Sequence, residues 1–222
     1  IIIAPEISLT DGILVEYVEK NAYTHTKHIF TEDIISSAKY YAGKYDVESG
    51  HYTKVMEIGT CLINTLSKKF GLSKRHSVLL KVASIFADTG YYINLNNYNI
   101  YSYDIVKANP ILGLSQKEHE IISSVVLFQN GVFDFDAYNR YSKNRKLLIS
   151  KLSAILSLSQ ALDVEYKQNV EKVKSSIRNG ILYINVYSND DLILEQREFN
   201  KAQDFFEEVF GIKAVLVKKG LK

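Results

Sequence analysis

The helical spacing of apolar residues between about residue 31 and residue 163 constrains the fold of this chain more than any other feature. In the segment HYTKVMEIGTCLINTLSKKFG, apolar side chains recur every three or four residues, and the segment ends at Gly71, a residue suited to close a helix. Later segments repeat this pattern, and Ser115 with Glu118 three residues on forms a helix-starting capping box. The pattern predicts an all-helical domain over residues 23–163.

The composition of the chain changes near Glu165. From there, apolar and polar residues alternate on both sides of Asn179-Gly180, the strongest short signal for a β-hairpin. A third alternating segment, LILEQRE, precedes an amphipathic helix that Gly211 closes, and IKAVLVK follows as a last strand. These segments predict a small α+β domain over residues 164–222 with the order β-β-β-α-β. The chain as a whole is therefore predicted to be mainly α.

Charge, cysteine content and hydropathy exclude several classes of protein. The 222 residues carry a net charge of +2, which is too small to indicate nucleic-acid binding by itself. Cys61 is the only cysteine, which excludes a disulfide framework and a cysteine-based zinc site. No apolar run reaches the roughly 18 residues of a membrane span. We therefore expect a cytoplasmic protein with neither nucleic acid nor membrane as a partner.

Asp88 follows an apolar helical run in the stretch ASIFADTGYY, and its position raises the question of a metal site. His51 begins an earlier helix, and Gln160 and Asp163 end a later one. Imidazole and carboxylate groups on three helices can hold a divalent metal, which lowers the pKa of a bound water for attack on phosphorus. In the other interpretation, Asp88 caps the turn that comes after it or pairs with His51 across the helices.

Several segments in a fixed order resemble the exopolyphosphatase and guanosine-pentaphosphate phosphatase family. The resemblance runs from about residue 6 to residue 163, and the closing segment FFEEVFGIKAVL is similar as well. The segments that carry it, besides the helix that His51 begins, are LTDGIL, ASIFADTGYYI, ILGLSQKEHEIIS and ILSLSQALD.

The resemblance implies a place within a longer protein. In that family an N-terminal pair of actin-like domains hydrolyses polyphosphate or a nucleotide tail with magnesium. A helical domain of HD type and a small α/β domain follow. The chain opens on Ile-Ile-Ile without a methionine, so we expect residues 1–22 to be a linker from the upstream actin-like domain. The HD-type helical domain would then span residues 23–163, and Mg would belong to the catalytic half.

The chain departs from the family at the metal-ligand positions. Ala87 stands where the HD pattern has a histidine, and Gln160 stands where it has an aspartate. Two further histidines of the family pattern are replaced by Tyr101 and Gln129. His51 and Asp88 alone survive, and two protein ligands rarely hold a catalytic divalent ion. We therefore expect a vestigial site with no metal, no cofactor and no catalytic residue in this chain.

Three cations near the start of the last long helix are candidate substrate-binding residues. Polyanions are held by several Lys and Arg side chains, and the segment YSKNRKLLISK offers Lys143, Arg145 and Lys146. The resemblance implies that these residues contact inorganic polyphosphate, for substrate binding or chain-length selection. It also implies a possible homodimer. Two alternatives stay open: a free-standing HD-type nucleotide phosphohydrolase, and a regulatory module that senses a guanosine polyphosphate.

Overall fold

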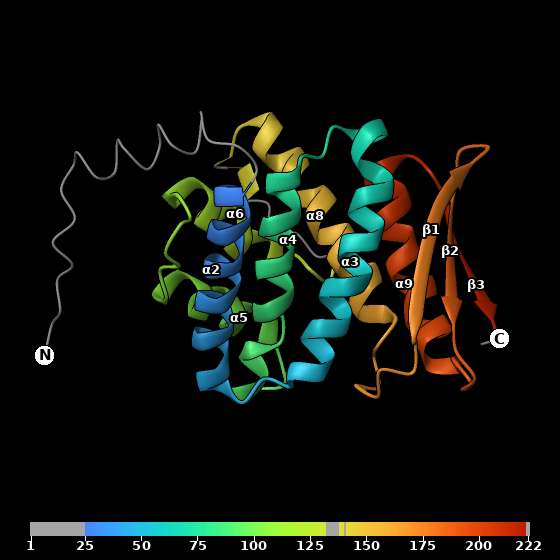
Figure 1. Cartoon of the computed structure of the whole chain (residues 1–222), viewed down its shortest axis with the longest axis horizontal. Coiled ribbons are helices and arrows are strands. Elements are labelled where there is room, and N and C mark those ends of the chain that lie inside the picture. Colours follow the sequence, from blue (N-terminus) through green and yellow to red (C-terminus); the bar gives the residue numbers. More distant parts are fainter. Residues whose placement is uncertain (1–24, 132–137, 140, 221–222) are drawn as a thin grey trace, which may run out of the picture.

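The computed structural model describes residues 25–131, 138–139 and 141–220, with side chains from residue 31 onward. The predicted linker over residues 1–22 lies outside this part. Figure 1 shows a mainly helical molecule with a three-stranded sheet at one end, as the sequence predicted. The helices of the described part are α2 (His25–Ala42), α3 (Ser49–Phe70), α4 (Lys74–Phe86), α5 (Tyr98–Ala108), α6 (Gln116–Leu127), α8 (Lys143–Ala161) and α9 (Ile193–Phe210), with two short 3₁₀ helices, η1 (Gly43–Tyr45) and η2 (Thr89–Tyr92).

The ends of the helices follow from local sequence signals. Gly71 closes α3 in the left-handed conformation, with φ at 68°, and its N–H donates to the carbonyl of Ser67. Ser115 caps α6, and Glu118 accepts from the backbone N–H of Ser115 at 2.9 Å, which completes the predicted capping box. Ser73 caps α4 in the same way, with His76 as the other member of the box. These caps fix where the core-facing stripes begin and end.

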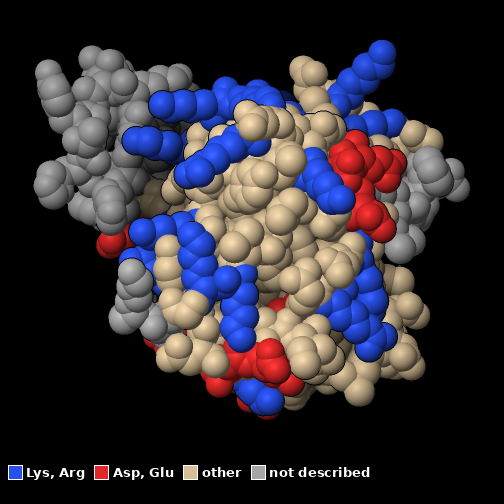
Figure 2. Space-filling view, turned by 90° about the vertical axis from the view of Figure 1, so that its right-hand side faces the viewer, with Lys and Arg blue, Asp and Glu red and all other residues tan. Residues whose placement is uncertain are grey.

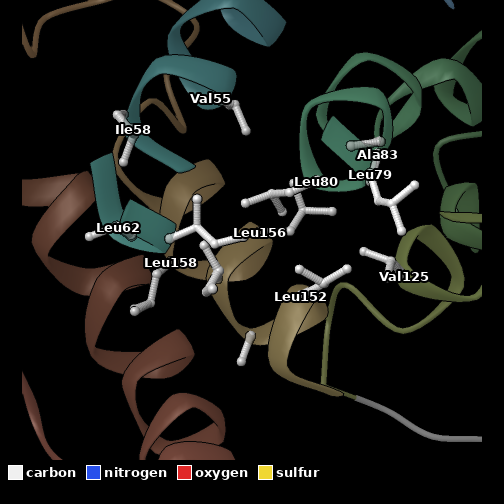
Figure 3. Close-up of a cluster of buried hydrophobic side chains, with 14 of the residues drawn as sticks. Val55, Ile58, Leu62, Leu79, Leu80, Ala83, Val125, Leu152, Leu156 and Leu158 are labelled. Atoms are coloured by element: carbon white, nitrogen blue, oxygen red, sulfur yellow. The ribbon is translucent and has the colours of Figure 1, made fainter. Parts of the chain in front are cut away.

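The core of the helical part is built around α4 and α8. Both helices bury most of their residues, α4 packs against α2, α3 and α6, and α8 packs against α3, α4, α6 and α9. Each fully buried Leu or Ile stabilises the fold by about 1.5–3 kcal/mol relative to an exposed one. Figure 3 shows side chains from α3, α4, α6 and α8 meeting in this core, among them Ile58, Leu80, Val125, Leu152 and Leu156.

The sheet consists of β1 (Lys172–Arg178), β2 (Ile181–Tyr187) and β3 (Ala214–Lys219), in that spatial order. β1 and β2 form the predicted antiparallel hairpin, in which Asn179 and Gly180 have φ values of 52° and 76°. β3 lies parallel to β2, because α9 crosses between them. Figure 1 shows α9 between the sheet and the helical bundle.

The predicted third strand is wrong, because LILEQRE belongs to the beginning of α9. The order observed after residue 170 is therefore β-β-α-β. The alternation in LILEQRE covers only a few residues, and no turn separates this segment from the rest of the helix. The helical spacing of the buried residues runs through the segment instead: Glu195, Phe199, Ala202, Phe206 and Phe210 lie three or four residues apart on one face of α9.

The small α/β part packs directly on the helical part. α9 contacts α8, and β1 contacts α3, where the hydroxyl oxygens of Thr65 and Ser175 lie 2.7 Å apart. The predicted division of the chain at residues 163 and 164 stays a prediction. Within the described residues, no helix combines the length and the apolar character that crossing a membrane requires.

Candidate functional site

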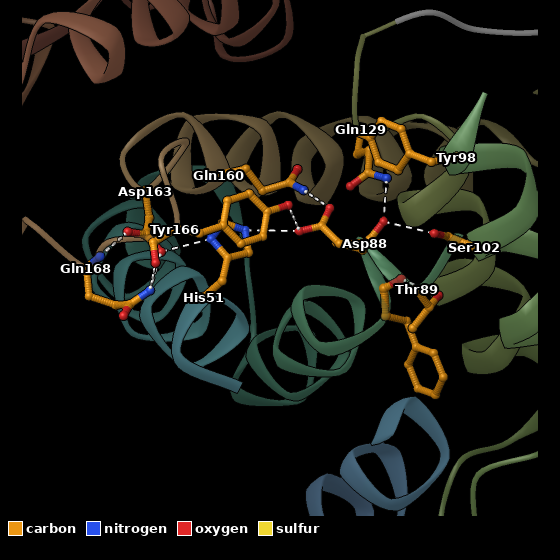
Figure 4. Close-up of polar contacts among 12 residues, drawn as sticks. His51, Asp88, Thr89, Tyr98, Ser102, Gln129, Gln160, Asp163, Tyr166 and Gln168 are labelled. Carbon is orange, nitrogen blue, oxygen red and sulfur yellow. Dashed lines mark hydrogen bonds and ion pairs between the residues drawn. The ribbon is translucent and has the colours of Figure 1, made fainter. Parts of the chain in front are cut away.

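Three charged side chains meet where α3, α4 and α8 come together. His51 lies in the first turn of α3, Asp88 follows the end of α4, and Asp163 follows the end of α8. All three are buried, with 3%, 7% and 1% of their surfaces exposed. Figure 4 shows the imidazole of His51 between the two carboxylates.

Both ring nitrogens of His51 face a carboxylate oxygen. Nε2 lies 3.0 Å from Oδ2 of Asp88, and Nδ1 lies 2.8 Å from Oδ2 of Asp163. A carboxylate accepts hydrogen bonds, so both nitrogens donate and the ring carries a proton on each. The structure thus shows the predicted contact between His51 and Asp88, together with a second contact that the sequence reasoning missed.

The pKa of His51 reports this arrangement. Burial by itself lowers the pKa of the imidazole, because a buried charge loses its hydration. The hydrogen bonds to Asp163 and Asp88, together with the negative charges of both residues, outweigh burial and raise the pKa of His51 to about 9. His51 is therefore a cation at neutral pH, held by two anions.

Polar neighbours complete the hydrogen bonding of both carboxylates. Asp88 accepts from the hydroxyl of Tyr166 at 2.8 Å and from the amide of Gln160 at 3.2 Å. Asp163 accepts from the backbone and side chain of Gln168 at 2.7 and 3.3 Å. The ring of Tyr166 also stacks on the imidazole, 3.8 Å from it between ring centroids, which favours a cationic ring. We call these six residues the His51 network: His51, Asp88, Gln160, Asp163, Tyr166 and Gln168.

The donor set of the His51 network does not fit a divalent metal. Each ring nitrogen of His51 already contacts a carboxylate oxygen, so a metal could bind the imidazole only by displacing Asp88 or Asp163 from it. Ala87 has no donor side chain, and its carbonyl oxygen already accepts from Gln129 at 2.9 Å and from Ser102 at 3.0 Å. Among the described residues, no group of three or more His, Cys, Asp or Glu side chains has an arrangement that could hold a metal ion. The network is built as a clamp between helices.

The second partner of His51 had a sequence signal of its own. Asp163 ends the apolar run of α8 just as Asp88 ends that of α4, so two carboxylates close two helices that flank α3. The comparison with an HD pattern drew attention to Gln160 in the last turn of α8, yet Asp163 contacts the imidazole directly and Gln160 only contacts Asp88.

The three predicted substrate-binding cations lie at the other end of α8. With a rise of about 1.5 Å per residue, Lys143 lies about 25 Å from Gln160 along the helix. Lys143 is exposed, whereas Arg145 pairs with Glu120 at 2.9 Å and Lys146 donates to the side chain of Asn139 at 2.8 Å. This group is therefore separate from the His51 network, and two of its members have local partners.

A larger group of exposed cations lies on the outer face of the sheet. The inner face of β2 buries Leu182, Ile184 and Val186, and the pairing register places alternate residues on the opposite face. Figure 2 shows lysine and arginine side chains around an uncharged centre on this side of the molecule. We define the cationic sheet face by its four exposed cations, none of which pairs with an acidic residue of the described part: Lys172, Lys174, Arg178 and Lys219.

Comparison with known proteins gives one family. The family model described as Ppx/GppA phosphatase, domain III, matches residues 35–203, from α2 into α9. The match thus covers most of the helical part, the His51 network and the β1–β2 hairpin. A search of curated proteins finds no match to the chain.

Proposed function

Because the chain belongs to the Ppx/GppA phosphatase family, we propose that it is the C-terminal portion of an exopolyphosphatase-like phosphohydrolase. The parent protein would remove the terminal phosphate of inorganic polyphosphate. The matched model is that of domain III, which agrees with a parent that carries its catalytic carboxylates and Mg in other domains. This chain would bind the substrate and select its chain length.

The His51 network supports a division of labour between this chain and the rest of the parent. A phosphohydrolase of HD type needs a metal to activate water, and among the described residues no group of three or more His, Cys, Asp or Glu side chains is arranged to hold one. We therefore expect no phosphohydrolase activity from this chain alone. The free-standing HD-type nucleotide phosphohydrolase, the first of the two alternatives, is disfavoured for the same reason.

The observation that carries the substrate proposal is the cationic sheet face. Polyphosphate is a flexible polyanion, and such chains are bound by several cations that release counterions together. Lys172, Lys174 and Arg178 alternate along β1, so their side chains line one edge of the same face. Exposed cations without an acidic partner lose no ion pair when an anion binds.

The group at the start of α8 is the second proposed contact for the same polyanion. Lys143 is exposed, and α8 begins there, so its unpaired backbone N–H groups add to the positive potential. Arg145 and Lys146 would have to leave Glu120 and Asn139, at least in part, to reach a phosphate. We therefore rank Lys143, Arg145 and Lys146 below the sheet face in expected effect.

Binding of labelled polyphosphate to the purified chain tests the proposal. The triple variant K172A/K174A/R178A should bind long polyphosphate at least tenfold more weakly, and K143A/R145A/K146A less so. The double variant K107A/K117A removes exposed lysines elsewhere and is the control. In the complete protein, the first variant should raise KM for long chains more than for short ones.

Two results would contradict the proposal. Equal affinity of wild type and both triple variants would remove the cations from substrate binding. A chain that sediments as a dimer, and becomes monomeric only in K172A/K174A/R178A, would instead assign the sheet face to contact between two copies.

A further inference from the structure

A pocket of about 410 Å³ opens beside the His51 network. Its lining includes three residues of the network, two tyrosines and two residues of α9: Asp88, Gln160, Tyr166, Tyr91, Tyr98, Lys201 and Phe205. Its volume lies within the range of about 300–1,000 Å³ that is usual for small-molecule sites. The pocket is therefore large enough for an organic ligand rather than a single water.

Gln129 brings an unsatisfied hydrogen-bond acceptor to this pocket. Its amide nitrogen donates to the carbonyl oxygen of Ala87 at 2.9 Å, so the amide cannot turn over without setting two oxygens against each other. Its oxygen, Oε1, is buried and has no hydrogen-bond partner. In Figure 4 this oxygen points to the side of Gln160. Such atoms are rare, because a buried unpaired acceptor costs about 1–3 kcal/mol.

The pattern distinguishes Gln129 from the rest of the described residues. The one other buried side-chain atom without a partner there is Oε2 of Glu195, which does not line the pocket. A ligand with an N–H group would satisfy Gln129 and remove that cost. The pocket therefore favours a ligand that donates a hydrogen bond at this point.

The charges around the pocket do not favour an anionic ligand. His51 contributes one positive charge, and Asp88 with Asp163 behind it contributes two negative charges. At the rim, Lys201 pairs with Glu198 at 2.7 Å, which adds no net charge. Among the described residues that line the pocket, the charges of His51 and Asp88 and those of Lys201 and Glu198 balance, so no unpaired cation is present there to attract a phosphate group. The ligand of this pocket differs from the polyanion proposed for the outer surface.

The remaining lining groups match the chemistry of a nucleobase. Tyr91 and Tyr98 stack on each other with 4.0 Å between ring centroids and offer a flat aromatic wall. Three amide side chains, Gln129, Asn130 and Gln160, line the same space. Proteins hold single bases by stacking on aromatic rings and by hydrogen bonds from amide side chains to the base edge.

We propose that this pocket binds an uncharged nucleobase or nucleoside. An N–H group of the base donates to Oε1 of Gln129, and the plane of the base lies along the wall formed by Tyr91 and Tyr98. Any phosphate attached to the nucleoside stays outside the pocket. The proposal does not rest on polyphosphate binding, since it uses a different surface and an uncharged ligand.

Calorimetric titration of the purified chain with adenosine, guanosine, cytidine and uridine tests the proposal. We expect at least one nucleoside to bind, and its triphosphate to bind more weakly than the nucleoside. Q129L removes the acceptor and should weaken binding at least tenfold. Q196L is the matched control, because Gln196 is an exposed glutamine on α9.

A second variant guards against loss of folding in Q129L, because that change also removes the bond to Ala87. S157F fills the pocket from α8 and leaves Gln129 in place, and it should abolish binding while the melting temperature stays near that of the wild type. The proposal is overturned if no nucleoside binds, or if the triphosphates bind at least as tightly as the nucleosides. It is also overturned if S157F leaves nucleoside binding intact. Binding of the cation spermidine in place of the nucleosides would contradict it as well.

Discussion

The His51 network and the cationic sheet face both contain several charged side chains, but within the described part of the chain the charges are buried and paired in the first and exposed and unpaired in the second. In the network a cation and two anions are buried, and each charge has fixed hydrogen-bond partners. On the sheet face four cations are exposed to solvent, and none pairs with an acidic residue of the described part. The charges of the network are neutralised by neighbouring side chains, whereas the charges of the sheet face can be neutralised by an anion from solution.

This difference separates stability from binding. A buried charge that loses its partner has neither water nor a counterion to stabilise it. A single substitution in the network should therefore destabilise the fold strongly. Exposed cations are hydrated already, and their removal costs the fold little. Four predictions test whether the two regions differ in this way.

Removal of the His51 side chain should have the largest effect on stability. In H51A two buried carboxylates face each other without a cation, and we expect a loss of about 3–5 kcal/mol in the free energy of unfolding. H119A is the control, because His119 is half-buried and has one hydrogen bond, to a backbone carbonyl. Urea unfolding measures both. A loss below about 1 kcal/mol in H51A would show that the network does not clamp the helices.

The stability of the chain should fall at alkaline pH. The pKa of His51 is raised from 6.5 to about 9 in the folded chain, so the folded state binds more protons than the unfolded state between these values. The contribution is complete below about pH 6.5 and is lost as the pH rises through 9, with a total of about 3 kcal/mol. Urea unfolding at several pH values measures it. A free energy of unfolding that is constant or rises over this pH range would contradict the prediction. The same dependence on pH in H51A would contradict it as well.

Neutralising the sheet face should change stability by less than about 0.5 kcal/mol. In K172A/K174A/R178A we expect an unchanged urea midpoint and a weaker salt dependence of polyphosphate binding. Each lost phosphate contact lowers the slope of log K against log salt by about 0.7–0.9 for nucleic acids, and a similar value is expected here. A marked loss of stability would show that these exposed cations stabilise the fold, as the buried charges of the His51 network do.

The smallest effect is expected at the pair formed by Lys201 and Glu198 on α9. Both side chains are partly exposed, at 59% and 32%, so their ion pair should contribute about 0.2–1 kcal/mol. The double-mutant cycle K201A, E198A and K201A/E198A isolates this coupling energy. A coupling above about 2 kcal/mol would mean that the rim of the pocket behaves like the buried network.

Much of the helical part could be predicted from sequence, because its signals are local. Gly71, Ser73 and Ser115 mark helix ends by capping preferences that depend on a few neighbouring residues. The predicted third strand was wrong because the local signal there was misleading. Leu192 and Leu194 resemble a strand locally, while the periodicity that decides the structure lies further on, at Phe199 and Phe206.

The candidate site could be predicted only in part. The pairing of Asp88 with His51 followed from the cost of a buried carboxylate, but the contact with Asp163 depends on how three helices approach each other. The close approach at Gly90 is similar, since a Cβ there would collide with the backbone of Tyr98. The sheet face depends on strand register, and the orientation of the Gln129 amide depends on its long-range hydrogen bond to the carbonyl oxygen of Ala87.

The central claim is that His51 is a cation clamped between two carboxylates and not a metal ligand. Nitrogen NMR of the imidazole in the purified chain at about pH 8, between the pKa of 6.5 of a free histidine and the value of about 9 here, tests it directly. We predict protons on both ring nitrogens and no change when Mg²⁺ or Mn²⁺ is added. A neutral ring with one protonated nitrogen, or a resonance that a metal ion shifts or broadens, would contradict the account.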